Sequence, residues 1–332
     1  MPLVQHNHLP SFQRVQAEGV ELCRLEDVNP DLPAIKIGFL NMMPDAALAA
    51  TERQFLRLLG ANSNVNSYFY PFSINGVERS EETQEYIKQH YIDFMQLKSM
   101  QVDALVITGA NVSQPLLTNE NFWSDLEKVL IWAKDNIRST LCSCLATHAA
   151  VKVFYDINRK HLGDKCWGVF PHKVVNEGHA LLKHVAADID MCHSRFNDIS
   201  YDDFNNNNVD VLIQSQQAGV QLAAERDLSV IYFQGHPEYD DISLLKEYKR
   251  EIIRYLTQQR EDYPPVPAAY FDEDALNEAA TYKKFVANAD NFEGLLEKFP
   301  ETALQKNLIN PWKKPALTIF SNWLDFLANK KA

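Results

Sequence analysis

The sequence predicts an α/β protein built on a mostly parallel sheet flanked by helices. Between residues 34 and 156, short apolar runs alternate with longer amphipathic segments, which is the pattern of parallel βα units. Three apolar runs end in breaks, at residues 41–45, at 109–115 and at Cys144. Ligands of such sheets bind outside the carboxyl ends of the strands. We therefore expect these three breaks to lie along one edge of the sheet and to form a site there.

The individual elements follow from local patterns. The runs at 34–40, 67–72 and 102–109, and the segment leading into Cys144, are strand-sized and rich in apolar residues. Helices are expected where large apolar residues recur at helical spacing. These segments are 46–59, 81–100, 121–136 and the stretch that follows Cys144 and closes near residue 156.

The second half of the chain has a different pattern. Short strand-like runs at 168–175, 209–213, 220–224 and 228–233 predict a meander or hairpins that complete the sheet. A periodic helix is expected at 241–260, a Pro-rich linker at 263–267, one or two acidic helices within 273–299, and an amphipathic helix at 316–330. We therefore divide the chain into an N-terminal arm (1–33), an α/β domain (34–260) and a C-terminal helical extension (261–332).

Composition excludes several classes of partner. The 332 residues are 46% hydrophobic, which is enough for a large core, and carry a net charge of −12. An acidic surface argues against nucleic acid or an anionic membrane as the main partner. Five cysteines, an odd number, suit a reducing compartment. The N-terminus lacks the pattern of a signal peptide, and the apolar runs are shorter than the ~20 residues of a membrane helix, so we expect a cytoplasmic protein.

Cys144 is the first candidate for chemistry. It lies where an apolar strand turns into an Ala-rich helix, and a helix N-terminus stabilises a thiolate. Taken alone, such a cysteine is more often a buried structural thiol. Cys142 competes, because it lies two residues earlier and would share a face with Cys144 on a strand. We prefer Cys144 because it lies nearer the turn, a choice that depends on where the strand ends.

His236 and Glu238 supply a base and an acid at the end of another strand. Gly235 and His236 close an apolar run, and Pro237 prevents Glu238 from continuing it. A lone histidine is more often a structural residue, but a rigid turn with His and Glu on one side suits a base and the group that orients it. The hypothesis is therefore one site with a Cys nucleophile, a His base and an orienting Glu.

Other common sites are not supported by the sequence. Cys142, Cys144 and His148 lack the spacing of a zinc site with a second ligand pair. Neither a GxGxxG nor a GxxxxGK[ST] phosphate loop occurs, and no GxSxG motif occurs. We expect no metal and no bound cofactor.

Together, the motifs resemble one family. The chain is similar to the homoserine O-acyltransferases of the homoserine O-succinyltransferase type, which are related to class I glutamine amidotransferase domains. The resemblance implies a class I glutamine amidotransferase-like (flavodoxin-like) fold with N- and C-terminal extensions, and a homodimer. It spans nearly the whole chain in family order, at residues 40–44, 51–59, 107–110, 140–144, 168–169, 193–196, 235–240 and 322–324.

This resemblance implies a ping-pong acyltransferase of methionine biosynthesis. Cys144 would take an acyl group from succinyl-CoA or acetyl-CoA, and His236, held by Glu238, would activate the hydroxyl of L-homoserine to remove it. The acyl-CoA is a co-substrate. Backbone amides near Leu145 and in the loop at 41–45 are candidates for an oxyanion hole.

Further residues match the family's substrate contacts. The resemblance implies that Lys165, Ser194 and Arg250 bind substrate, with Arg250 suited to grip a carboxylate in a bidentate manner. The position that separates acyl donors falls near Ser113, where a small neutral residue leaves room for a succinyl group. The family's lysine pair after the Met-Pro of the first loop is absent, because Pro44 is followed by an Asp and an Ala-rich run. We favour succinyl over acetyl.

Three alternatives remain open. The acceptor could be a related hydroxy amino acid such as serine. The same three residues could instead serve a glutamine amidotransferase-type hydrolase, although Ser143 and Leu145 replace the glycines that usually flank its cysteine. A ligand-binding protein without activity is a third hypothesis, against which the retention of Cys144, His236 and Glu238 argues.

Overall fold

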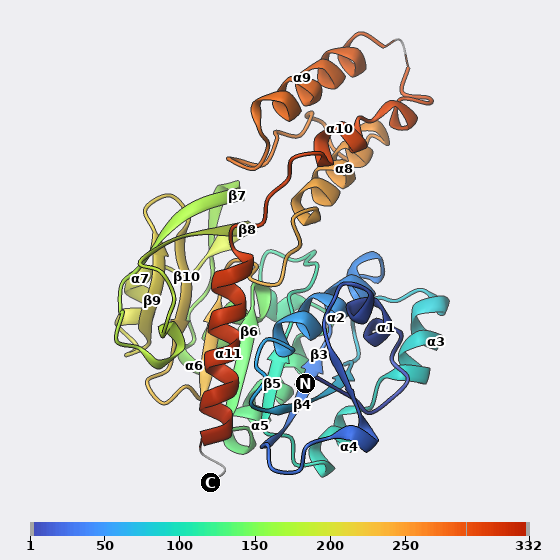
Figure 1. Cartoon of the computed structure of the whole chain (residues 1–332). Helices are drawn as coiled ribbons and strands as arrows, with labels where there is room; N and C mark the ends of the chain where they lie inside the picture. The colour runs from blue at the N-terminus through green and yellow to red at the C-terminus, as the bar shows by residue number, and fades with distance from the viewer. Residues whose placement is uncertain (1–2, 290, 330–332) are drawn as a thin grey trace.

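One mixed sheet runs through the molecule, and helices cover both of its faces (Figure 1). The computed structural model describes residues 3–289 and 291–329. The strand order is β2-β1-β4-β3-β5-β6-β11-β10-β9-β7-β8. Neighbours from β2 to β11 are parallel, whereas β11-β10-β9-β7-β8 are antiparallel. The predicted mostly parallel α/β architecture is thereby confirmed.

The elements have the following bounds. The strands are β1 (Leu3–Gln5), β2 (Leu22–Arg24), β3 (Ala34–Leu40), β4 (Asn66–Phe72), β5 (Ala104–Ile107), β6 (Ser139–Ser143), β7 (Lys160–Val174), β8 (Asp188–Asp198), β9 (Asp210–Ser215), β10 (Gly219–Ala224) and β11 (Val230–Phe233). The α-helices are α1 (Pro10–Ala17), α2 (Asp45–Leu59), α3 (Glu81–His90), α4 (Phe94–Ser99), α5 (Trp123–Asn136), α6 (Leu145–Tyr155), α7 (Tyr201–Asn205), α8 (Ser243–Leu256), α9 (Glu273–Ala287), α10 (Glu301–Gln305) and α11 (Lys313–Asn329).

Two apolar clusters lie on opposite sides of the sheet. One contains Phe39 of β3 together with Phe55 of α2 and Trp323 of α11. The other contains Leu105 of β5 together with Leu130 of α5 and residues of α6. Alternate side chains of a strand point to opposite faces, so the central strands are buried on both sides. This explains their nearly continuous apolar character.

The segment at 81–100 forms two helices rather than the single helix predicted. Between α3 and α4, Ile92 pairs with Phe72 at the end of β4, which pulls the chain out of helical geometry. Asp93 then starts α4 with a capping box, in which its side chain accepts from the amide of Gln96 and the Gln96 side chain accepts from the amide of Asp93. A cap of this kind favours a new helix over a continuous one.

The antiparallel half contains a strand that local patterns did not indicate. β8 pairs along β7, with Trp167 opposite Ser194 and Gly168 opposite His193. Two of its polar residues, His193 and Arg195, are buried and weaken the apolar signal of a strand, whereas Asp188 and Asp190 are exposed. This pairing places Lys165 and Ser194 on neighbouring strands.

The two ends of the chain also pack on the sheet. β1 pairs with β4 and β2 in the part expected to be an arm. In Figure 1, α8, α9 and α10 form a lobe beyond the sheet, and α11 returns along it. Before α11, Trp312 is buried and its indole N–H donates to the carbonyl of Tyr239 at 2.8 Å. Among the residues described, no helix combines the length and apolar character needed to cross a membrane.

Candidate active site

The predicted edge of the sheet brings the ends of three strands together. β6 lies between β5 and β11, with Cys142 opposite Ile107 and Ser143 opposite Phe233. The residues that follow these strands are therefore adjacent. Gly109 illustrates this, since a Cβ built on it would lie 3.6 Å from the Cβ of Cys144.

Cys144 occupies a strained turn at the end of β6. Its φ of 53° and ψ of −109° are unusual for a residue with a side chain, and it is the N-cap residue of α6. The amide of Cys144 donates to the carbonyl of Phe233 at 2.7 Å, and the Thr147 hydroxyl donates to the same carbonyl at 2.8 Å. These bonds fix a sharp strand-to-helix turn that holds the thiol out of the strand, as in nucleophile elbows.

The competing thiol of Cys142 lies inside the apolar core. Cys142 is fully buried, whereas Cys144 is partly exposed. Burial raises the pKa of the Cys142 thiol, because a thiolate would be desolvated there. Of these two cysteines, Cys144 is therefore the one placed to meet a substrate.

His236 is in contact with both Glu238 and Cys144. Nδ1 of His236 lies 2.8 Å from Oε1 of Glu238, which leaves Nε2 for the hydrogen bond with Cys144. Burial alone would lower the pKa of His236, but the charges of Glu238 and Cys144 outweigh it and hold that pKa well above its ordinary value. The His236 ring therefore binds a proton readily beside the Cys144 sulfur.

The backbone around His236 is fixed from several sides. A Cβ on Gly235 would lie 2.6 Å from the carbonyl oxygen of Cys192, so only glycine allows this approach. The amide of His236 donates to that carbonyl at 3.0 Å. Arg57 of α2 donates to the carbonyl of Glu238 at 3.1 Å and pairs with Asp240 at 2.5 Å. The turn that carries the base is therefore tied to both halves of the sheet.

A second buried carboxylate, Glu247 of α8, adjoins this site. Its Oε2 accepts from Lys165 at 3.0 Å and from Ser194 at 2.5 Å, and its Oε1 accepts from the Tyr239 hydroxyl at 2.6 Å. The Tyr239 ring stacks on His236 with the ring centroids 4.1 Å apart. Glu247 thus connects two predicted substrate residues to the ring of the predicted base.

Glu247 was not predicted from the sequence, although a signal for it existed. It lies on the apolar side of α8 among Leu244, Tyr248 and Ile252, where a buried charge requires partners. Burial would raise the pKa of Glu247, but the charge of Lys165 and the hydrogen bonds from Ser194 and Tyr239 lower it to about 2. The carboxylate is therefore ionised throughout the neutral range.

We expect Glu247→Gln to lower the free energy of unfolding by about 1–3 kcal/mol at neutral pH, because Lys165 loses its buried counter-charge. The folded pKa lies below the ordinary value of 4.5, so this contribution is present above pH 4.5 and is lost as the pH falls toward 2. Urea unfolding followed by circular dichroism between pH 3 and pH 7 measures it. Glu278→Gln, at an exposed position of α9, is the matched control. Equal losses in both variants would contradict the prediction.

The remaining predicted residues lie at the periphery. Arg250 is exposed on α8 and forms no hydrogen bond or ion pair with residues 3–289 or 291–329. Ser113 is exposed in the loop after β5, where its amide donates to Glu120 at 2.8 Å. Neither contacts Cys144 or His236 directly. Their roles as substrate-binding and acyl-specificity residues stay predictions.

The amides expected to form an oxyanion hole divide into two groups. In the loop after β3, the amides of Asn41, Met42 and Met43 already donate to protein oxygens, and Pro44 has none. Arg79 also donates to the carbonyls of Asn41 and Met43. This loop therefore offers no free N–H before α2 begins. By contrast, a Cβ on Gly109 would lie 3.9 Å from the amide nitrogen of Leu145, so the Gly109 and Leu145 backbones meet beside Cys144.

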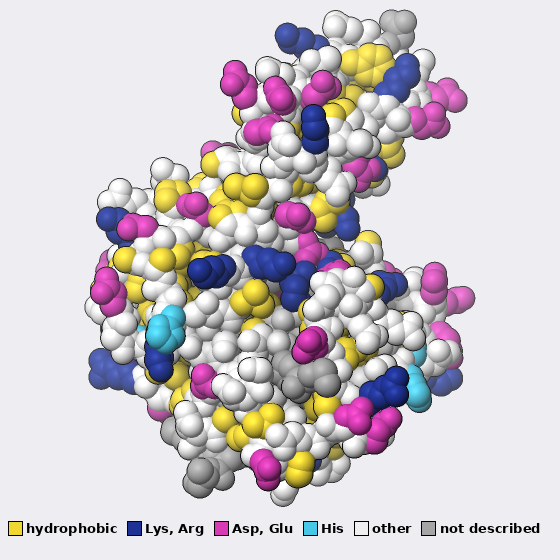
Figure 2. Space-filling model, viewed as in Figure 1, with side chains coloured by type: hydrophobic (Ala, Val, Ile, Leu, Met, Phe, Trp, Pro, Cys, Tyr) yellow, Lys and Arg dark blue, Asp and Glu magenta, His cyan; other side chains and the backbone are white. Residues whose placement is uncertain are grey.

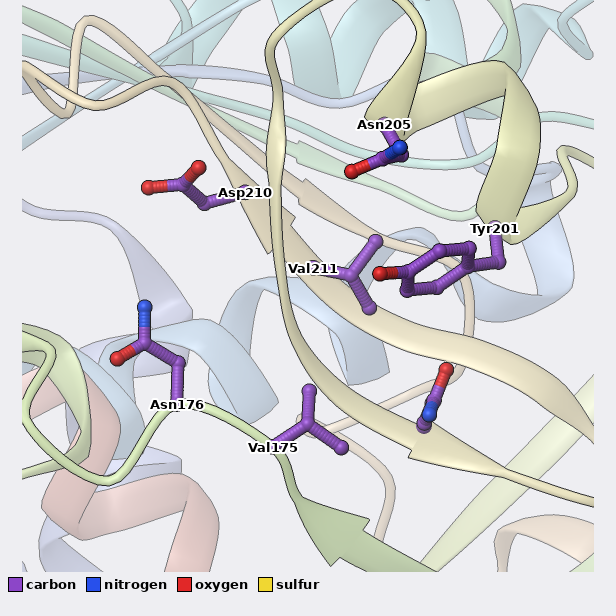
Figure 3. A pocket seen from close by; sticks show the side chains of 7 residues that line it. Val175, Asn176, Tyr201, Asn205, Asp210 and Val211 are labelled. Carbon is purple, nitrogen blue, oxygen red and sulfur yellow. The ribbon is translucent and has the colours of Figure 1, made fainter.

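Two further observations concern sites other than the one around Cys144. Within the described ranges, no group of three or more His, Cys, Asp or Glu side chains could hold a metal ion. A surface pocket is lined from one side by Tyr201 and Asn205 of α7, with Asn176 across Val211 (Figure 3). It shares no residue with the Cys144 site.

Comparison with known proteins identifies close relatives. A model of the homoserine O-succinyltransferase family matches residues 2–332. The homoserine O-succinyltransferase of Methylobacter tundripaludum is 47% identical over 327 residues, which cover 98% of this chain and 92% of that protein. The homoserine O-succinyltransferase of Methylococcus capsulatus is 45% identical, with the same two coverages.

A solved structure supports the fold. The structure of a glutamine amido transferase from Methylobacillus flagellatus has a TM-score of 0.52 at 12% identity and covers 89% of this chain and 96% of that chain. At this identity the likeness concerns architecture alone, and it confirms the predicted amidotransferase-like fold.

Proposed function

The chain belongs to the homoserine O-succinyltransferase family, and from this membership we propose that it moves a succinyl group from succinyl-CoA to the hydroxyl of L-homoserine through a thioester on Cys144. The observation that carries the proposal is the contact of Cys144 with His236, whose Nδ1 is held 2.8 Å from Glu238. The nucleophile, the base and the acid that orients the base are thus arranged as a covalent mechanism needs them. The product would serve methionine biosynthesis as an activated form of homoserine.

In the first half-reaction the Cys144 sulfur attacks the carbonyl carbon of the thioester. His236, whose pKa is held well above its ordinary value, carries the proton of the Cys144–His236 pair on Nε2 as the sulfur attacks, and Glu238 stabilises this imidazolium. Collapse of the tetrahedral intermediate breaks the bond to the CoA sulfur, which leaves with the proton from His236. The succinyl group then remains on Cys144.

In the second half-reaction the acceptor replaces CoA. Nε2 of His236 takes the proton of the homoserine hydroxyl, and the oxygen attacks the Cys144 thioester. Breakdown of the second intermediate returns the proton and the electron pair to the sulfur. Amides of Gly109 and Leu145 are the best candidates to bind the oxyanion in both steps, since their backbones meet beside Cys144.

The acceptor is a zwitterion, and α8 carries groups of both signs, Glu247 and Arg250. Arg250 has no partner among the residues described and suits the acceptor carboxylate. Glu247, held by Lys165 and Ser194 and bonded to the tyrosine that stacks on His236, places negative charge where an ammonium group would be favoured. We therefore propose that homoserine lies between Arg250 and the Glu247 cluster.

The co-substrate is an anion, although the chain as a whole carries a net charge of −12. Figure 2 shows a row of Lys and Arg side chains across the middle of one face, beneath the helical lobe. Such a row attracts the phosphates of a CoA molecule locally despite the overall charge.

An acceptor-dependence assay tests this function. We expect purified protein given succinyl-CoA to release free CoA thiol steadily only when L-homoserine is present, because the second half-reaction needs a hydroxyl. Parallel reactions with acetyl-CoA, and with serine in place of homoserine, test the competing donor and acceptor. Steady release without any acceptor would indicate a hydrolase, and ammonia from glutamine without CoA release would replace the proposal with an amidotransferase-type activity.

A further inference from the structure

Arg159 is a half-buried cation without a carboxylate partner. It lies between the end of α6 and the start of β7. Its Nε is buried and has no hydrogen-bond partner in residues 3–289 and 291–329, and its guanidinium forms no ion pair there. The one side-chain hydrogen bond it makes is long, from Nη2 to the carbonyl of Gln114 at 3.4 Å. Keeping a guanidinium partly desolvated and unpaired costs free energy unless a ligand supplies the missing partner.

The loop that Arg159 contacts also reaches the Cys144 site. This loop starts at Gly109, against Cys144, and reaches Gln114, whose carbonyl faces Arg159. The buried carboxylate of Glu120 holds it, since Oε1 accepts from the amides of Ser113 and Gln114 at 2.8 and 2.7 Å. Glu120 is thus occupied by the loop, and its charge reaches Arg159 without forming an ion pair.

The charges of two groups near the site act on Arg159. Burial lowers the pKa of Arg159, and the charges of Glu120 and Cys144 act in the opposite direction. Arg159 likewise helps to lower the pKa of the buried His148 on α6, after the larger effect of burial and that of Arg195. The guanidinium is therefore within electrostatic range of the Cys144 sulfur and keeps its positive charge at neutral pH.

We propose that Arg159 binds the distal carboxylate of the succinyl group carried by Cys144, and that it thereby selects succinyl-CoA over acetyl-CoA; the inference rests on the proposed function. In a succinyl thioester the carboxylate carbon lies roughly 4 Å from the thioester carbon, given C–C bonds of ~1.5 Å. The Nε edge of Arg159 offers the paired donors that a carboxylate takes. An acetyl group has no such carboxylate and leaves the guanidinium unpaired.

Arg159 and Ser113 would favour the succinyl group in different ways. A small neutral residue at 113 only leaves room for the longer acyl group. Arg159 adds an attraction, and specificity needs an attractive or a repulsive element as well as space. Glu120 fixes the loop that carries Ser113, and the carbonyl of Gln114 in the same loop accepts from Arg159.

The test compares three acyl donors in the full-length protein. The variants are Arg159→Gln, Arg159→Lys and the control Lys160→Gln, which changes the exposed neighbouring residue. The donors are succinyl-CoA, acetyl-CoA and butyryl-CoA, the last having the succinyl chain length without the carboxylate. kcat/KM is measured for each with L-homoserine, and acyl-Cys144 formation without acceptor is followed by intact-protein mass spectrometry.

We expect Arg159→Gln to lower kcat/KM for succinyl-CoA by about 10- to 100-fold, the range of a charge-assisted hydrogen bond. Activity with acetyl-CoA and butyryl-CoA stays at the wild-type level, Arg159→Lys falls in between for succinyl-CoA, and Lys160→Gln behaves as wild type. If Arg159→Gln does not fold by circular dichroism, the donor-selective loss in Arg159→Lys decides the question.

Two results would overturn the inference alone. One is an unchanged preference for succinyl-CoA in Arg159→Gln, and the other is an equal loss with all three donors, which would assign Arg159 to the thiol or to the fold. A wild-type protein that transfers none of these groups to homoserine would instead overturn the proposed function itself.

Discussion

Cys144→Ala is expected to abolish acyl transfer, lowering kcat by at least about 10⁴-fold, because the proposed mechanism carries the acyl chain on the Cys144 sulfur. The fold should be kept, since the turn is held by backbone bonds and by the Thr147 hydroxyl rather than by the thiol. Incubation with succinyl-CoA alone should add a succinyl mass to the wild-type peptide that contains Cys144 and none to the variant. Transfer activity and peptide mass spectrometry measure the two effects.

Cys142→Ala is the matched control for this prediction. Its thiol is fully buried on the preceding strand, and burial raises its pKa. The variant should therefore keep its acyl-enzyme and its turnover while losing some stability to a small cavity. Comparable loss of turnover in both variants, or an adduct on Cys142, would contradict the assignment of the nucleophile.

Glu238→Gln is expected to lower kcat/KM by roughly 10²–10⁴-fold, since a neutral amide neither fixes the His236 tautomer nor stabilises the imidazolium. Burial lowers the pKa of His236, and the charges of Glu238 and Cys144 raise it well above its ordinary value. Without Glu238 the pKa of His236 falls. His236 then loses its proton at a lower pH. The fall of kcat/KM on the basic side of the pH profile should therefore begin at a lower pH.

Asp240→Asn provides a control close to Glu238. Asp240 pairs with Arg53 and Arg57 beneath the same turn and does not contact the His236 ring in the described structure. This variant should lose stability while its pH profile keeps the wild-type basic limb. A Glu238→Gln profile with an unshifted basic limb would show that Glu238 does not hold the proton on His236.

The parallel half of the fold was predictable because its signals are local. β3 and β4 are mostly apolar and are followed by helix or loop signals, and these strands lie at or within one residue of the expected bounds. The antiparallel half was predicted less completely. β8 contains His193 and Arg195, which are buried only because β7 and the Cys192–His236 backbone contact surround them. Only the first part of β8, residues 188–191, alternates exposed polar and buried apolar residues, and the buried polar residues that follow interrupt that pattern.

The same division applies to the site. Local sequence was enough to predict that Cys144 follows a strand and that His236 and Glu238 share a rigid turn at a strand end, because these are properties of neighbouring residues. Other features depend on how the chain folds: Cys142 is buried, Glu247 joins Lys165, Ser194 and Tyr239, and Arg159 faces the loop beside Cys144. Those partners come from different helices and strands, so their side chains meet only when the whole chain has folded.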